Sequence, residues 1–234
     1  MNIIKKIIDI IFPHLCLSCE KITTEDNFFC TDCLPKIKKI KDPKCSKCSL
    51  PFDNDVIKNN VCRTCFKKKF FYDKVIPIFV YNNIIANAIS NFKYKDQPNL
   101  GKKFAKLILD ELDTNLENFD YIIPVPLHKN KLTKRKYNQS AIIAKLICKK
   151  KFIPDLLFRV FDNVSQVKLK KNERQKNLKH AFRFNKKYQD LIKGKTIIVV
   201  DDVITTGATI NYCSKELKRN GVKKVIIIAI TKRI

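Results

Sequence analysis

The chain has 234 residues, of which 45% are hydrophobic and 30% are charged, and this composition excludes a wholly disordered protein. Its 48 Lys and Arg residues against 22 Asp and Glu residues give a formal net charge of +26, which favours anionic partners: nucleic acid, phosphorylated metabolites or a lipid surface. Because Lys, Ile and Asn are abundant while Gly occurs only 4 times, A+T-rich codon usage explains the same charge, and both interpretations stand.

The first twelve residues, from Met1 to Phe12, are the candidate for a targeting segment. Charged residues interrupt their apolar run, no small-residue cleavage site follows, and no stretch reaches the roughly 18 apolar residues that span a bilayer. We therefore expect no transmembrane segment and a cytoplasmic location. Isoleucines recur at helical spacing until Pro13, which predicts a short amphipathic helix packed on the protein itself, in preference to a membrane-surface anchor.

Eight of the 10 cysteines form C-x2-C pairs, all within the first 65 residues. Each pair places two thiolates on one tight turn, and two pairs complete a tetrahedral set of sulfur ligands that suits zinc. Disulfides are the alternative, but they are rare in a cytoplasmic chain. Four sulfur ligands leave no open position, so we expect two structural zinc ions that contribute to folding. The expected ligands are Cys16, Cys19, Cys30, Cys33, Cys45, Cys48, Cys62 and Cys65.

The simplest pairing of these cysteines is sequential, with the first four around one zinc and the last four around the other; an interleaved pairing is the alternative. Cys148 and Cys213 lie in apolar surroundings and are expected to be packed thiols. The basic run Lys67-Lys68-Lys69 indicates the end of a metal-binding module over residues 1–70, and residues 71–234 are expected to form a second domain.

After residue 70, apolar strands alternate with amphipathic helices, which indicates an α/β fold whose parallel sheet is covered on both faces. Ligands bind outside the carboxyl ends of such strands, and the loops after Val125 and Val200 carry the unusual residues. The expected strands are 74–81, 121–125, 196–200 and 225–230, and the expected helices lie around 84–92, 104–112, 141–147 (opened near Asn138) and 208–219 (with Gly221 as C-cap).

The segment from Val199 to Thr209 reads VVDDVITTGAT: a strand, two acids, a hydroxyl-rich turn with glycine, and the start of a helix. Such a turn directs backbone N–H groups at one place and suits a phosphate, and Gly207 allows close approach and a positive φ. A phosphate would repel Asp201 and Asp202, whose natural partners are sugar hydroxyls or Mg²⁺ and its waters. The pattern fits a ribose 5-phosphate, and an ordinary acidic turn is the alternative.

This segment closely resembles the 5-phosphoribosyl-1-pyrophosphate (PRPP) signature of the type I phosphoribosyltransferases. Together with the cysteine pairs, the segment PVPLHKNKLTKRKYNQS and a region containing Arg159, Gln166, Arg174 and Asn177, it makes nearly the whole chain similar to the ComF family. The resemblance implies a type I phosphoribosyltransferase-like parallel sheet flanked by helices, behind a small N-terminal zinc-ribbon module. It further implies PRPP and Mg²⁺ as ligands, and a role in handling DNA during natural transformation, with single-stranded DNA and other DNA-uptake proteins as partners.

Carried over by position, the resemblance assigns Asp201 and Asp202 to the ribose hydroxyls. It assigns the 5-phosphate to Thr205, Thr206, Gly207, Ala208 and Thr209, and the start of the pyrophosphate loop to Pro126, Leu127 and His128. Residues 166–174 resemble the loop that closes over the reacting centre, with a solvated basic helix as the alternative.

Two further matches concern residues that lie earlier in the chain. Arg135, Asn138 and Gln139 match the family's arginine-glycine-aromatic-asparagine-glutamine motif, but Lys136 stands where the family usually has Gly. Lys93, together with Tyr94, stands where the family has a Lys-Tyr pair, and we count it among the ligand-binding residues.

An enzyme with these residues would displace pyrophosphate at the anomeric carbon of ribose, with Mg²⁺, Arg135 and Arg174 stabilising the leaving group beside Asp201 and Asp202. His128 is a candidate general acid, although a lone loop histidine is more often a hydrogen-bonded bystander. Purine transferases commonly have a carboxylate where this chain has Thr205, so we do not expect purine salvage. Any hood over an acceptor base is expected to come from residues 1–115.

The alternative function is a catalytically inactive accessory factor that binds single-stranded DNA. Lysines and arginines cluster over residues 129–136 and 168–179, and phenylalanines alternate with lysines in the metal module. Aromatic side chains among cations offer stacking surfaces for bases, although these phenylalanines equally suit a small core around the metals.

Overall fold

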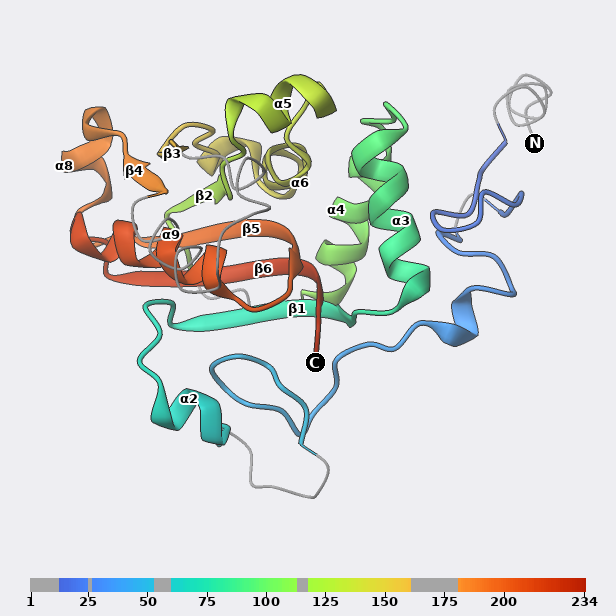
Figure 1. Ribbon diagram of the computed structural model, residues 1–234, viewed down its shortest axis with the longest axis horizontal. Coiled ribbons are helices and arrows are strands. Elements are labelled where there is room, and N and C mark those ends of the chain that lie inside the picture. Colours follow the sequence, from blue (N-terminus) through green and yellow to red (C-terminus); the bar gives the residue numbers. More distant parts are fainter. Residues whose placement is uncertain (1–12, 25–26, 53–59, 113–117, 161–180) are drawn as a thin grey trace, which may run out of the picture.

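The computed structural model describes residues 13–24, 27–52, 60–112, 118–160 and 181–234, so the expected N-terminal helix lies outside the described residues. Its centre is a four-stranded sheet in the order β1-β6-β5-β2, in which every pairing is parallel (Figure 1). The strands are β1 (Lys74–Val80), β2 (Tyr121–Pro124), β5 (Thr196–Ile204) and β6 (Lys224–Lys232). The expected α/β fold with a parallel sheet is confirmed.

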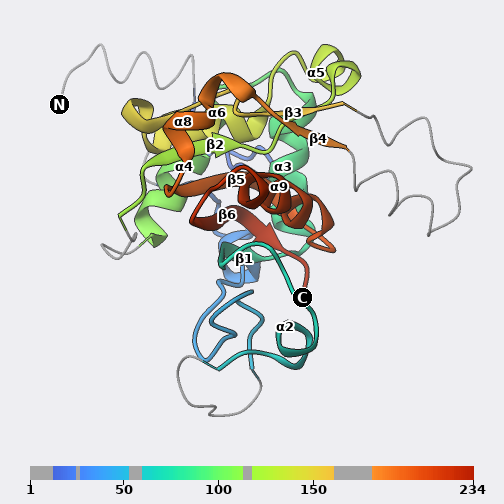
Figure 2. The ribbon, with the colours of Figure 1, turned by 90° about the vertical axis from the view of Figure 1, so that its left-hand side faces the viewer.

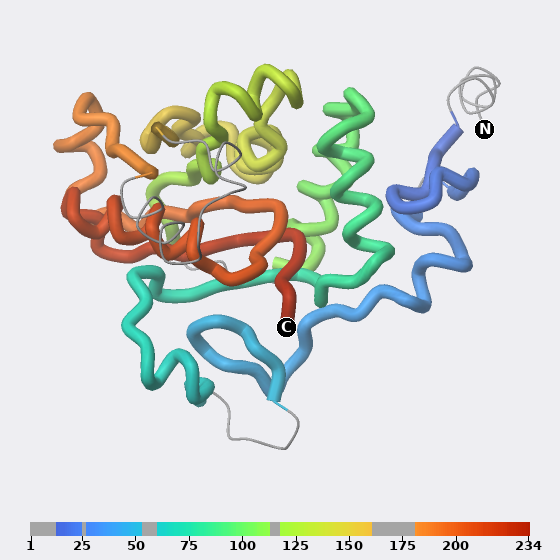
Figure 3. The backbone as a smooth tube through the Cα atoms, in the orientation of Figure 1, coloured from blue at the N-terminus to red at the C-terminus, as the bar shows by residue number. Residues whose placement is uncertain are grey.

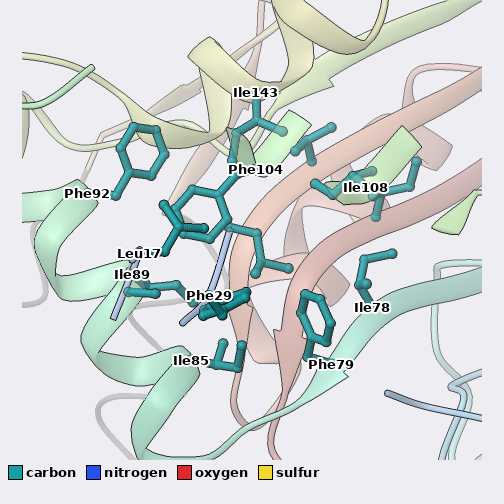
Figure 4. Packing of buried hydrophobic residues seen from close by; sticks show 14 of the residues in the cluster. Leu17, Phe29, Ile78, Phe79, Ile85, Ile89, Phe92, Phe104, Ile108 and Ile143 are labelled. Carbon is teal, nitrogen blue, oxygen red and sulfur yellow. The ribbon is translucent and has the colours of Figure 1, made fainter. Parts of the chain in front are cut away.

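Helices cover both faces of this sheet, and each face has its own apolar core. On one face, α3 (Asn83–Tyr94), α4 (Leu100–Glu111) and α6 (Gln139–Ile147) bury their apolar sides, with Phe92, Phe104 and Ile143 packed close together (Figure 4). On the other face, α9 (Ala208–Arg219) packs against β5 and β6. The arrangement confirms the alternation of strand and helix signals in the sequence.

Shorter elements complete the described chain. A second, antiparallel sheet pairs β3 (Leu157–Arg159) with β4 (Phe182–Phe184), and the sequence patterns had not predicted it. The remaining helical segments are η1 (Leu34–Lys36), α2 (Arg63–Lys67), α5 (Lys129–Arg135), η2 (Lys149–Lys151), η4 (Lys186–Tyr188) and α8 (Gln189–Ile192). None of the helices within the described ranges combines the length and the apolar character that a bilayer crossing requires.

Strand β5 is longer than the sequence pattern predicted. The apolar run ends at Val200, but pairing with β6 continues to Ile204, which lies opposite Lys232. Asp201 and Asp202 are therefore part of the strand rather than of a loop after it. Because successive strand residues face opposite sides of a sheet, the two carboxylates are directed towards different helical layers.

Two cysteine-rich segments, one from Cys16 to Cys33 and one from Cys45 to Cys65, lie at different places on the sheet domain. The first runs beside α3 and contributes Leu17 and Phe29 to the core around Ile85 and Ile89, as Figure 4 shows. The second lies beyond the edge strand β1, on the side away from β2 (Figure 2). The tube in Figure 3 follows the chain from one segment to the other and then through α2 into β1, across the expected domain boundary at residue 70.

Candidate functional site

The eight paired cysteines form two clusters in the order of the sequence. Within each cluster the sulfur atoms all lie within 4.8 Å of one another, so the pairing is sequential and the interleaved alternative is wrong. The first cluster consists of Cys16, Cys19, Cys30 and Cys33, and the second consists of Cys45, Cys48, Cys62 and Cys65.

Each cluster fits a zinc ion by the chemistry of its donor atoms. The Cys45 sulfur accepts hydrogen bonds from the N–H groups of Cys62 at 3.3 Å and Cys48 at 3.5 Å. Burial raises the pKa of the Cys45 thiol, but these N–H groups outweigh burial and lower the pKa to about 7. The same balance, with the N–H groups of Cys19 and Cys30, lowers the pKa of Cys16 to about 6. Because each cluster offers four cysteine sulfur atoms, which is the donor set of a structural zinc site, both clusters are suited to structural zinc.

At the carboxyl end of β5, Asp202 forms an ion pair with Lys93 of α3, with 2.8 Å between the carboxylate oxygen and Nζ. The side chains are only 12% and 16% exposed, so this pair is well screened from water. The neighbouring Asp201 behaves differently. Burial, and then the charge of Asp202, raise the pKa of the Asp201 carboxyl to about 7, against the opposing influence of Lys93 and Arg159. Asp202 is thus paired with a lysine, while the pKa of Asp201 lies near neutrality.

The turn that follows these acids connects β5 to α9. Thr205 and Thr206 are exposed, and Gly207 has a left-handed φ of 74° at the N-cap of α9. A Cβ at Gly207 would meet little, so its φ rather than lack of space requires glycine. The turn and the first residues of α9 surround a hollow of about 20 Å³ next to Asp201. We call residues 205–209 the phosphate loop, because backbone N–H groups at a helix N-terminus suit an anion.

A second loop with predicted ligand residues, Pro126–His128, follows β2. Asn138 holds it in place, since its amide group donates to the carbonyl of Val125 at 3.0 Å and accepts from the N–H of Ser140 at 3.0 Å. Asn138 is thereby the N-cap of α6, as the sequence predicted. His128 is the N-cap of α5, where its Nδ1 accepts from the N–H of Asn130 at 3.3 Å.

Arg135, predicted to stabilise a leaving group, joins three helices. Its guanidinium donates to Gln139 of α6 and to the hydroxyl of Tyr94 of α3, each at 3.4 Å, and lies 5.4 Å from the centre of the Tyr94 ring. The side-chain nitrogen of Gln139 is buried and lacks a hydrogen-bond partner among the residues that the structure describes. The structure therefore brings Lys93, Tyr94, Arg135 and Gln139 to neighbouring positions on these helices, whereas Arg174 lies outside the described residues.

Lys136, which stands where the resemblance led us to expect glycine, has a left-handed φ of 63°. The position therefore favours glycine for its conformation, and the lysine adopts the same conformation at a cost of about 1 kcal/mol. Its ammonium group pairs with Asp96, a second non-glycine residue with positive φ.

Arg159 is among the residues that carry the family resemblance in the sequence, but no role in the site was predicted for it. Arg159 lowers the pKa of Asp201 and lines a groove of about 750 Å³ that also reaches Pro126 and His128. No local sequence pattern places Arg159 near Asp201. The two residues come close because β3 packs against the main sheet through a shared apolar core.

Comparison with known proteins covers both parts of the chain. Residues 7–69 match the model of a double zinc ribbon domain, and residues 155–234 match the model of a phosphoribosyl transferase domain. The described fold and these matches together identify a phosphoribosyltransferase-like sheet domain with an N-terminal zinc ribbon.

Full-length relatives agree with these two matches. Competence protein F of Haemophilus influenzae is 29% identical over 92% of this chain and 95% of its own. The DNA utilization protein YhgH of Salmonella typhimurium is 26% identical over 91% and 94%, and competence protein ComFC of Bacillus subtilis is 26% identical over 84% and 80%. The match to the competence proteins runs through both the zinc-ribbon region and the phosphoribosyltransferase region, so the chain is similar to these ComF-type proteins along most of its length.

Proposed function

We propose that this protein binds PRPP, or a phosphoribosyl group of a larger ligand, together with Mg²⁺ at the carboxyl end of β5, and that it acts in DNA uptake or utilisation. One observation carries the binding proposal. The acid pair Asp201 and Asp202 directly precedes the phosphate loop, and Asp201 lines the small hollow that this loop surrounds. This order of groups matches a ribose with a 5-phosphate.

In this proposal each part of the site has its own task. The phosphate loop holds the 5-phosphate, and Asp202, which is paired with Lys93, accepts hydrogen bonds from the ribose hydroxyls. Asp201, which lines the hollow at the phosphate loop, would supply a carboxylate oxygen of the kind that Mg²⁺ prefers. Mg²⁺, when bound, would neutralise charge on the pyrophosphate. The role in DNA handling comes from the names of the relatives, which include a DNA utilization protein and two competence proteins.

Transfer chemistry at this site would break the bond between the anomeric carbon and pyrophosphate and form a bond from that carbon to an acceptor nucleophile. Arg135 would stabilise the leaving pyrophosphate from the side of α5. The Asn138 contact with Val125 would keep the Pro126–His128 loop in position for it. The proposed function is therefore binding of the ligand, since transfer also requires an acceptor nucleophile.

Calorimetry of the zinc-loaded protein with PRPP and Mg²⁺ tests the proposal. We expect a dissociation constant in the micromolar range, about −8 kcal/mol, that is lost in an Asp201→Asn/Asp202→Asn variant. Asp110→Asn, an exposed acid on α4, is the matched control and should bind as the wild type does. Absence of binding in the wild type would refute the proposal.

A second candidate function is binding of single-stranded DNA without catalysis. Helix α5 carries four basic residues and no acid among its seven residues, and it borders the groove of about 750 Å³ in which Phe158 is 44% exposed. Cations beside an exposed aromatic ring suit a nucleic-acid strand. Fluorescence anisotropy with an oligothymidine should show affinity that falls steeply with salt and is reduced in Lys131→Ala/Lys134→Ala, whereas flat salt dependence would count against this function.

A further inference from the structure

The second cysteine cluster lies directly against the phosphate loop. A crevice of about 180 Å³ is lined by Cys62 and Cys65 together with Thr205, Thr206 and Gly207. The loop that is proposed to hold a phosphate therefore has a zinc ligand set as its neighbour. Nothing in the sequence indicates this, since the two parts are separated by most of the chain.

Asn211, in the first turn of α9, connects the two parts. Its side-chain oxygen accepts a hydrogen bond from the N–H of Phe71 at 2.8 Å, and its own N–H donates to the carbonyl of Gly207 at 3.0 Å. Phe71 follows the last zinc ligand, Cys65, after a short stretch of chain that includes the end of α2. Asn211 thus holds the chain leaving the second cluster on one side and the phosphate loop on the other.

Lys232 makes a second connection at the end of β6. Its ammonium group donates to the carbonyl of Cys48 at 2.5 Å, and its backbone lies opposite Ile204, the last residue before the phosphate loop. The next residue, Arg233, donates its N–H to the carbonyl of Ile204 at 2.9 Å. The start of the loop is therefore fixed to the same strand end that contacts the cluster.

The cluster itself is firmly attached to the sheet. Val75 of β1 donates its N–H to the carbonyl of Lys47 at 2.9 Å and accepts from the hydroxyl of Ser49 at 2.6 Å. In contrast, the first cluster is attached to α3 and α4, where Asn91 and Lys103 donate to carbonyl groups of residues next to Cys16. Folding of the second cluster can therefore influence the ends of β1 and β6, whereas folding of the first cluster influences α3 and α4.

We propose that the second cysteine cluster, with its zinc, is the positioning element of the phosphate loop, and that it acts through Asn211 and Lys232. Loss of zinc from this cluster loosens residues 205–209, whereas loss of zinc from the first cluster does not. Linkage makes the effect reciprocal, so a ligand on the loop slows the release of zinc from the second cluster. This reciprocal part rests on the proposed binding of PRPP, but the effect of zinc on the loop does not.

Amide hydrogen exchange tests the effect of zinc without any ligand. We compare Cys65→Ser, which breaks the second cluster, with the matched variant Cys19→Ser, which breaks the first, and measure zinc content in both. Each variant should lose one zinc. Exchange at residues 205–209 should rise about tenfold or more in Cys65→Ser and stay unchanged in Cys19→Ser. Unchanged exchange in Cys65→Ser, or an equal rise in both variants, would overturn the proposal.

Asn211→Ala tests the connection between the second cluster and the phosphate loop while both clusters stay intact. This variant provides the deciding measurement if Cys65→Ser fails to fold. The control is Asn220→Ala at the other end of α9, where the asparagine contacts Glu216. Both variants should keep two zinc ions, and faster exchange at residues 205–209 should occur in Asn211→Ala alone. Unchanged exchange at these residues in Asn211→Ala would refute the role of Asn211.

PRPP then tests the reciprocal part. In the wild type, PRPP with Mg²⁺ should slow zinc transfer from the second cluster to a chromogenic chelator, and this protection should be lost in Asn211→Ala. The dissociation constant of PRPP should rise about tenfold in that variant, a change of about 1.4 kcal/mol. If the wild type does not bind PRPP, the proposed function fails, while the exchange experiments still decide the coupling between zinc and loop. If PRPP binds but zinc release is unaffected, the reciprocal coupling is wrong.

Discussion

Lys93 of α3 and Asp202 of β5 form an ion pair between two side chains that are both largely enclosed by protein. The pair spans the boundary between a helix layer and the sheet, next to the phosphate loop. Because an enclosed charge that loses its partner is strongly destabilising, this contact ties the stability of the fold to the geometry of the site.

Replacing Lys93 should therefore lower stability. In Lys93→Met we expect the free energy of unfolding to fall by about 2 kcal/mol at pH 7, because the enclosed carboxyl group of Asp202 loses its ion-pair partner. Urea unfolding followed by circular dichroism measures the change. Lys95→Met is the control, since Lys95 pairs with Glu20 in a more exposed contact, and it should cost less than about 1 kcal/mol. Equal effects of the two substitutions would contradict this prediction.

The raised pKa of Asp201 predicts a pH dependence with a definite sign. The folded protein holds this proton up to about pH 7, whereas the unfolded chain releases it near the ordinary aspartate pKa of 3.8. The contribution of Asp201 to stability therefore decreases as the pH rises between these values, because the folded state binds more protons. Asp201→Asn should be more stable than the wild type at pH 8 and similar to it below pH 4. Unfolding free energies across this pH range provide the test, and parallel curves for the two proteins would disprove it.

Metal content should follow the sequential pairing. We expect two zinc ions per chain by elemental analysis, one fewer in Cys45→Ser, and one fewer in Cys30→Ser. The double variant should contain none and should lose cooperative unfolding, because zinc supplies folding free energy to small ligand-rich segments. Cys148→Ser, outside both clusters, should keep both ions. Loss of both ions from either single cluster variant would argue against independent sites.

Lys136 offers a test of backbone conformation. Its left-handed φ predicts that Lys136→Gly raises the free energy of unfolding by about 0.5–1 kcal/mol, despite the loss of an exposed ion pair with Asp96. Lys134→Gly, inside α5, should instead lower it by about 1 kcal/mol, since glycine weakens a helix interior. Thermal or urea unfolding of both variants decides between these directions. A loss of stability in Lys136→Gly would show that the lysine side chain matters more than its backbone.

Local signals in the sequence were sufficient for much of the fold. The apolar spacing predicted α9 with its observed bounds, Ala208–Arg219, although its C-cap is Asn220 and not the expected Gly221. The capping residue Asn138 predicted the start of α6. The cysteine spacing predicted both metal clusters, because each knuckle is formed by neighbouring residues.

Features that depend on distant partners were not predictable in this way. Strand β5 continues through Asp201 and Asp202 because β6 pairs with it, which the drop in hydrophobicity after Val200 conceals. The contact between Phe71 and Asn211 likewise depends on how the second cluster packs on the sheet. The acid pair was assigned to the site from sequence, but the opposite orientation of its two members needed the strand.

The burial of Leu17 and Phe29 within the same core as Ile85 and Ile89 has a consequence for how the protein is made. During synthesis the cysteine-rich segments leave the ribosome before the sheet domain, and the apolar partners of the first segment arrive only with α3 and α4. Until then the zinc-loaded segment exposes the side chains that it later buries. A protein that lacks residues 1–70 would likewise expose the apolar surface of α3 that Leu17 and Phe29 cover. Expression of the sheet domain alone should therefore favour aggregation. Supply of zinc to the nascent chain thereby becomes a condition for the yield of the whole protein.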